Sequence, residues 1–174
     1  MKIFGLKFSA DRTALPCTIA LFVVLTIVAM TLVRLPLPSA LIVALIASAM
    51  HWFSEIWHNL GHAIVARGIG HPMIGLRFWT IFQVNVYPPD EGELPATIHV
   101  QRALGGPIAS VILVLVFAAL LLVPAQGSVL WWLVLFGLLE NLFVFTLQAF
   151  VPLGFNDGTT LWKWVPRLLR TARA

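Results

Sequence analysis

Four apolar runs, separated by short polar or proline-containing stretches, restrict this chain to folds that a lipid bilayer can hold. They cover about residues 14–33, 39–66, 102–123 and 129–151. A helix needs about 20 apolar residues to cross the hydrocarbon core, and each run reaches that length. Composition agrees, because 60% of the residues are hydrophobic and 10% are charged, whereas charged residues approach a quarter of a soluble domain. We predict an all-α polytopic membrane protein, a single domain over residues 1–174 with about four transmembrane helices.

Two shorter segments outside the runs have other patterns. Apolar and polar side chains alternate over residues 82–87, which is the period of a half-buried strand. We expect a short β-hairpin within residues 73–87, in a cytoplasmic central loop whose polar turn covers residues 88–93. Residues 159–173 mix tryptophan and leucine with four basic residues, which predicts an interfacial C-terminal helix.

The basic residues indicate the orientation in the membrane. With the amino terminus inside, ten of the eleven Lys and Arg residues lie on the inner side, and only Arg34 lies outside. They are three near the amino terminus, three near the central loop and four near the carboxyl terminus. The positive-inside rule therefore predicts an integral membrane protein with both termini cytoplasmic. It also explains the net charge of +4 without nucleic acid as a partner.

Ionisable residues are concentrated inside the second apolar run. They are His51, Glu55, His58 and His62. Their spacing of four, three and four residues places all the side chains on one stripe of a helix. Two histidines four residues apart can bind one metal ion, and the single cysteine, Cys17, excludes a cysteine-based zinc site. Such groups are costly in a bilayer and usually functional, although hydrogen bonds within a helix bundle can also hold them, and we predict a metal site.

A further acidic residue, Glu140, lies within the fourth run and requires a partner there. The second and fourth runs cross the membrane in the same direction. His51 and Glu140 each lie about a dozen residues from the outer end. We predict that they pair and hold these two helices side by side.

Three motifs occur in order along the chain: His58-Asn59-Leu60-Gly61-His62, then Leu104-Gly105-Gly106-Pro107, then Pro152 with Asp157-Gly158 after it. Their order and spacing resemble the site-two protease family of intramembrane zinc metallopeptidases, with a core over about residues 39–160. The resemblance implies that His58, His62 and Asp157 bind zinc near the cytoplasmic side. It also implies that the substrate is a membrane protein or a transmembrane helix in the lipid bilayer.

Departures from the family pattern concern the catalytic chemistry. The family has a glutamate after the first zinc-binding histidine, and Asn59 occupies that position of the general base. Asparagine cannot take a proton from metal-bound water near neutral pH. Ser110 and Ala149 occupy the positions of two family asparagines. We therefore expect weak or lost proteolysis, as in a pseudoprotease.

Glu55, one helical turn before His58, leaves several interpretations open. It is a candidate substitute base. It is also a candidate fourth metal ligand, which would fill a tetrahedral shell and leave no place for a reactive water molecule. A third interpretation is that Glu55 merely pairs with a neighbouring histidine.

Three hypotheses for the function follow. The first is an active or weakly active metallopeptidase whose strand at residues 81–87 holds an unwound substrate by edge pairing. The second is a non-catalytic subunit that binds membrane proteins within a larger membrane complex and contains a structural metal. The third, a haem-binding subunit, is disfavoured because the spanning histidines lie on one helix and the remaining ones, His71 and His99, lie in the central loop.

Overall fold

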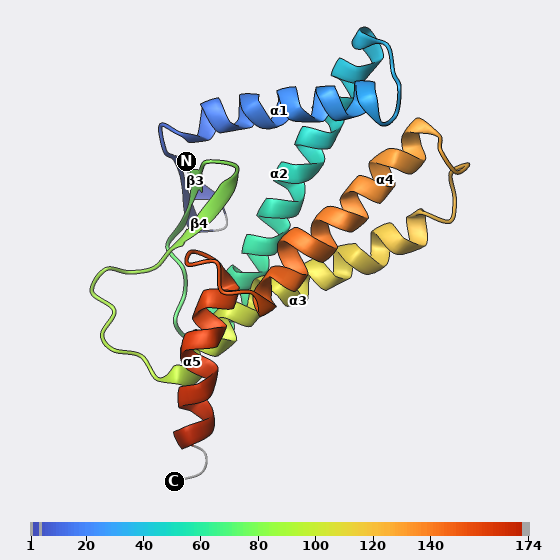
Figure 1. Ribbon diagram of the computed structural model, residues 1–174. Helices are drawn as coiled ribbons and strands as arrows, with labels where there is room; N and C mark the ends of the chain where they lie inside the picture. The colour runs from blue at the N-terminus through green and yellow to red at the C-terminus, as the bar shows by residue number, and fades with distance from the viewer. Residues whose placement is uncertain (1, 4, 172–174) are drawn as a thin grey trace.

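The computed structural model describes residues 2–3 and 5–171 of the chain. Its α-helices are α1, Ala14–Thr31; α2, Leu37–Gly68; α3, Ala96–Leu120; α4, Val129–Leu139; and α5, Asp157–Thr171. A π-helical turn, Glu140–Thr146, and a 3-10 turn, Leu147–Phe150, continue α4. Helices α3 and α4 run side by side, and α1 lies across the upper part of α2 (Figure 1).

Four segments of the described chain are long and apolar enough to cross a membrane: Ala14–Thr31, Leu37–Gly68, Ala96–Leu120 and Val129–Phe150. Many of their large apolar side chains are exposed, such as Ile42 and Leu115, and lipid would cover them. The predicted class, a mostly helical polytopic membrane protein with about four spans and a hairpin, is confirmed.

Several helix boundaries differ from the prediction. Helix α2 begins at Leu37 because Pro38 fits the first turn, where an amide hydrogen has no helical partner. Helix α3 begins at Ala96, so His99 lies on a helix and not in the central loop. The ring of His99 stacks on Trp164 of α5, with the ring centroids 4.0 Å apart. The fourth span is interrupted, because its second half follows π and 3-10 geometry.

A mixed sheet with the strand order β1-β2-β3-β4 lies beside the helices. The predicted hairpin is formed by β3, Gly75–Trp79, and β4, Phe82–Val86, which pair antiparallel. The basic residues near the amino terminus predict only a cytoplasmic tail, whereas the structure has two strands there, β1, Lys2–Ile3, and β2, Leu6–Ala10. Strand β2 pairs parallel with β3. Strand β4 is therefore an edge strand of the sheet.

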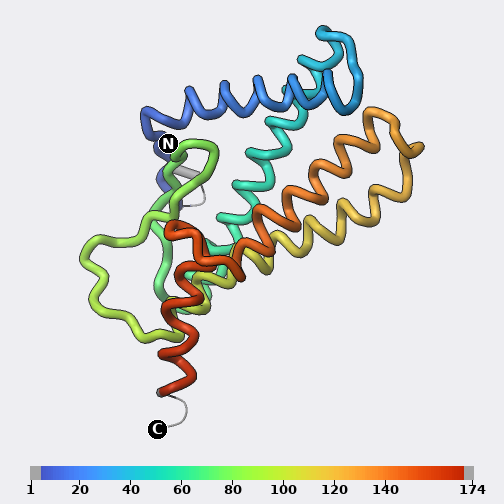
Figure 2. The backbone as a smooth tube through the Cα atoms, viewed as in Figure 1, coloured from blue at the N-terminus to red at the C-terminus, as the bar shows by residue number. Residues whose placement is uncertain are grey.

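Glycines allow α2 and α3 to cross at close range. A Cβ atom on Gly61 would lie 2.5 Å from the Cβ atom of Ala109, and one on Gly105 would lie 2.7 Å from the carbonyl oxygen of Gly61. Small residues at helix crossings permit such approaches in lipid. The crossing brings the lower end of α2 to the start of α3, near the start of α5 (Figure 2).

Candidate metal centre

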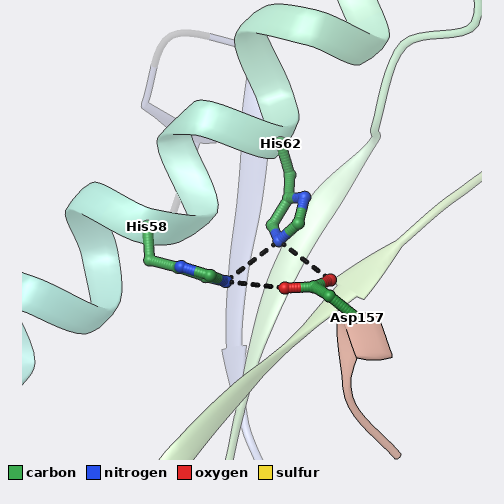
Figure 3. A group of neighbouring side chains, drawn as sticks. All are labelled: His58, His62 and Asp157. Carbon is green, nitrogen blue, oxygen red and sulfur yellow. Dashed lines mark hydrogen bonds and ion pairs between the residues drawn. The ribbon is translucent and has the colours of Figure 1, made fainter. Parts of the chain in front are cut away.

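The three predicted zinc ligands meet where α2 approaches the start of α5. His58 and His62 project from successive turns of α2, and Asp157 is the first residue of α5 (Figure 3). The Nε2 atom of His58 lies 3.1 Å from Nε2 of His62 and 3.1 Å from Oδ2 of Asp157. Nε2 of His62 lies 3.3 Å from Oδ1 of Asp157. The structure therefore brings residues 99 positions apart in the chain into one cluster.

A hydrogen bond on the far side of each imidazole fixes the orientation of the ring. Nδ1 of His62 lies 2.7 Å from the main-chain carbonyl of Arg102. A carbonyl only accepts, and this contact is shorter than the 3.2 Å between Nδ1 and the main-chain N–H of Gly106, so we assign the proton to Nδ1, and a neutral His62 then presents a bare Nε2. Nδ1 of His58 lies 2.9 Å from the hydroxyl of Ser110, which can accept in the same way. Outer hydrogen bonds of this kind orient histidines that bind metal ions.

The geometry of the cluster fits a divalent cation. Bare imidazole nitrogens and a carboxylate at this distance repel one another unless a positive charge lies between them. A tetrahedral zinc ion with bonds of about 2.0–2.2 Å holds its ligand atoms about 3.3–3.6 Å apart, close to the separations found here. Among the described residues, His58, His62 and Asp157 are the one group of this composition that could hold a metal. Three protein ligands leave a fourth position for water or substrate.

The charge of Asp157 also suits a cation. Burial alone would raise the pKa of its carboxyl group, but the nearby His62 and His58 outweigh burial and hold the pKa below its usual range. The carboxylate is therefore ionised at neutral pH.

Gly106 explains the need for small residues in the second motif. A Cβ atom at this position would overlap the Nε2 atoms of both His58 and His62. The glycine therefore leaves the space in which the two imidazoles face Asp157.

The carboxylate of Glu55 is bound away from the three ligands. Its Oε1 accepts hydrogen bonds from the main-chain N–H of Gln83 on β4 and from Nδ2 of Asn59, the latter at 3.4 Å. Nδ2 of Asn59 also donates to the main-chain oxygen of Glu55 at 2.7 Å. The structure thus gives no support to Glu55 as a fourth metal ligand. The hydrogen-bond partners of its carboxylate are Gln83 and Asn59, and not a neighbouring histidine. Glu55 fastens the edge of the sheet to α2.

The predicted pair of His51 and Glu140 is confirmed. Nδ1 of His51 lies 2.6 Å from Oε1 of Glu140, and its Nε2 lies 2.7 Å from the carbonyl of Ile81 in the turn of the hairpin. His51 therefore joins α2 to the π-helical turn and to the hairpin, and takes no part in the metal cluster.

A cavity of about 690 Å³ adjoins the three ligands. Its wall includes the edge strand β4, the 3-10 turn and the loop that follows β4. Arg102 holds this loop through Glu91, at 2.5 and 2.8 Å, and its guanidinium lies 3.9 Å from the centre of the Tyr87 ring. Burial raises the pKa of Tyr87 to about 12, so its hydroxyl keeps its proton at neutral pH. The cavity has room for a short stretch of extended peptide beside the cluster.

One residue of the site was not predicted from the sequence. The resemblance implies a lost amide at Ala149, but Ala149 lines a separate apolar groove with Leu161 and Val165. The neighbouring Gln148 reaches the site instead, and its Nε2 donates to Oδ2 of Asp157 at 2.7 Å. A polar residue inside an apolar run was the available sequence signal. The other departure, Ser110, keeps a polar contact to His58.

Comparisons with known proteins agree with the site. No protein-family model matches the sequence. A curated protein of Methanocaldococcus jannaschii, named "Putative zinc metalloprotease", is 39% identical over 86 residues, which are 49% of this chain and 40% of that protein. The match thus spans less than half the length of that relative.

A solved structure, titled Site-2 Protease from Methanocaldococcus jannaschii, has a similar fold. The TM-score is 0.61 at 20% identity, over 95% of this chain and 69% of that one. Fold and site together define an integral membrane protein with the fold of a site-two protease and a His-His-Asp group that could hold a metal ion. The resemblance to the site-two protease family is confirmed in the fold, and the partial sequence match to a protein named a putative zinc metalloprotease agrees with it.

Proposed function

We propose that the chain is a site-two-protease-like intramembrane metallopeptidase homologue that binds zinc through His58, His62 and Asp157. The observation that carries the proposal is the meeting of two imidazole nitrogens and a carboxylate at 3.1–3.3 Å beside a cavity. Bound zinc would polarise a peptide carbonyl and lower the pKa of its water toward about 7. The chain's own residues hold the metal, orient the imidazoles and shape the cavity.

The proposed substrate is a membrane protein or a transmembrane helix that unwinds at the site. Strand β4 ends the sheet and lines the cavity, which supports edge pairing with an extended segment. Glu55 already binds the outward N–H of Gln83. Main-chain groups point outward at every second residue of an edge strand. The main-chain groups of Asn85, two residues after Gln83, are therefore the expected contact for the extended substrate segment.

The proposed level of proteolysis is weak or absent. Asn59 stands at the position of the family base and cannot accept a proton from water. Glu55 remains the candidate substitute base, but two donors hold its carboxylate at strand β4. In this arrangement Glu55 anchors the strand, and catalysis requires that it leave these partners.

The second candidate function is a non-catalytic subunit of a larger membrane complex that binds membrane proteins and contains a structural metal. Asn59 favours it, because its amide bonds to Glu55 and supplies no base. Both candidates share the metal cluster and differ in whether peptide bonds are cut.

Both termini and the metal site are proposed to lie on the cytoplasmic side. Strand β2 pairs with β3 of the central loop, which supports an amino terminus on the same side as that loop. Asp157 begins α5 beside α2, which supports the same side for α5. The positive-inside rule then favours the cytoplasm for all three.

Metal analysis of the detergent-purified protein tests the proposal. After zinc loading and desalting, we expect about one zinc ion per wild-type chain and a large loss in His58→Ala and His62→Ala. His71→Ala is the matched control, because His71 contacts Glu91 and lies outside the cluster. Wild-type protein without zinc, or full zinc in both site variants, would contradict the proposal.

A further inference from the structure

Gln148 connects the interrupted fourth span to the metal cluster. Its Nε2 donates to Oδ2 of Asp157 at 2.7 Å, whereas Nε2 of His58 lies 3.1 Å from the same oxygen. The other oxygen, Oδ1, faces His62 at 3.3 Å. Gln148 is thus a hydrogen-bond partner of the carboxylate from outside the cluster itself.

The backbone of Gln148 also contacts the segment that carries Asp157. The π-helical turn before it and the 3-10 turn that contains it change the helical period, and π-helical turns are frequent at functional sites. Nδ2 of Asn156 donates to the main-chain oxygen of Gln148 at 2.9 Å. A Cβ atom on Gly158 would lie 2.5 Å from that oxygen. These contacts tie Gln148 to the segment that carries Asp157.

The orientation of the amide shows which contact dominates. Oε1 of Gln148 is buried and has no hydrogen-bond partner among the described residues. An unpaired buried carbonyl is unfavourable, because it has lost its hydrogen bonds to water. The side chain accepts this cost while its Nε2 stays on an ionised carboxylate, and hydrogen bonds to charged groups are the stronger kind.

We propose that Gln148 is a positioning residue for Asp157, which sets the carboxylate for metal binding through the Nε2–Oδ2 hydrogen bond. The inference rests on the proposed function, because it assumes that Asp157 is a metal ligand. It predicts that loss of the amide loosens the metal while His58, His62 and Asp157 remain in place.

Metal affinity and the visible spectrum of the Co²⁺ form test this role in the full chain. Gln148→Leu removes the hydrogen bond at similar size. We expect zinc affinity, measured by chelator competition, to fall about 10–100-fold, as for other outer partners of metal ligands, and the Co²⁺ bands to shift. Gln148→Asn keeps an amide but shortens it, and we expect a smaller change in the same direction. Gln126→Leu, at an exposed turn, is the matched control and should match wild type.

The possible outcomes separate the inference from the proposed function. Wild-type zinc affinity and an unchanged Co²⁺ spectrum in either folded Gln148 variant would overturn the positioning role alone. Absence of metal from the wild-type protein would overturn the role and the proposed function together. A merely structural role would lower the unfolding temperature of the metal-free variants and leave the Co²⁺ bands in place, and that result also overturns the inference.

Discussion

At the scale of single residues, Asn59 and Glu55 determine what the metal cluster can do. Nδ2 of Asn59 lies 3.4 Å from Oε1 of Glu55, so the position of the family base and the candidate substitute base are neighbours. A change at one therefore alters the electrostatic surroundings of the other. Single and double variants at Asn59 and Glu55 therefore test together which residue, if either, acts as the base.

If the missing base silences the protein, Asn59→Glu should raise cleavage of a helical reporter peptide, by up to about 10²–10⁴-fold. The single change also sets a second carboxylate beside Glu55, and two carboxylates in one site oppose each other's ionisation. We therefore expect the double variant Asn59→Glu/Glu55→Gln to cleave faster than Asn59→Glu alone. Mass spectrometry of the reporter products measures both rates.

The opposite pattern would identify Glu55 as the base. Wild type would then cleave, and Glu55→Gln would abolish cleavage while zinc remains bound. If every variant binds zinc and none cleaves any reporter, the peptidase hypothesis fails and the hypothesis of a non-catalytic subunit stands.

At the scale of the elements, the crossing of α2 and α3 builds the site. It places His58 and His62 of α2 against Ser110 and the carbonyl of Arg102 on α3. A wider crossing would break both outer hydrogen bonds. Stability and metal binding are therefore coupled through the same glycines.

Gly61→Ala should destabilise the protein, because the new methyl group meets Gly105 and Ala109. Overpacking of this kind costs about 1–3 kcal/mol, and zinc affinity should fall with it. Gly68→Ala is the control, since a Cβ there meets nothing within 4 Å and alanine favours a helix. Thermal unfolding in detergent compares the two, and equal midpoints would show that α2 and α3 have room to spare.

The loop of residues 88–95 should loosen in acid. The hydrogen bonds from Arg102 hold the pKa of Glu91 below its ordinary value of 4.5. A carboxyl group whose pKa is lower in the folded state stabilises that state above the ordinary pKa, and the contribution is lost as pH falls through the folded value. We expect amide-exchange protection of this loop, corrected for intrinsic rates, to be retained at neutral pH and to fall as the pH drops below the ordinary pKa of 4.5 and through the lower pKa of the folded state.

Variants of two arginines make this test specific. Arg102→Gln should lower protection at neutral pH and flatten its dependence on pH. Arg77→Gln, at an exposed position of β3, should behave as wild type. If the loop shows the same acid transition in Arg102→Gln, the ion pair of Arg102 and Glu91 does not hold the loop in place.

At the scale of the whole molecule, the sheet and the metal cluster restrict the topology. Strand β2 joins the amino-terminal segment to the central loop, and Asp157 joins α5 to the end of α2. Four spans satisfy both contacts only if these three parts lie on one side of the membrane.

Tag-accessibility mapping in intact cells should therefore place both termini in the cytoplasm. A tag in the turn between α1 and α2, near Arg34, should be accessible from outside. Opposite locations for the two termini would contradict the topology, and a reversed but consistent pattern would contradict only the positive-inside assignment.

The sequence by itself determined the features that depend on local spacing or on depth in the membrane. Run length predicted the spans, and the four-residue spacing predicted that His58 and His62 share a face of α2. Equal depth predicted the pairing of His51 with Glu140, which the structure confirms at 2.6 Å. These relations follow from constant rise and period, so they can be read without knowledge of the fold.

Tertiary structure alone decided the features that depend on contacts between distant segments. Pairing of Lys7 with Gly75 turns a basic tail into strand β2, and nothing in either short segment specifies the partner. The partners of Glu55 depend on the position of β4. The π and 3-10 turns change the register of the fourth span, and so Gln148, rather than Ala149, contacts Asp157. Sequence spacing transfers along a regular helix, but it fails where packing against other helices changes the period.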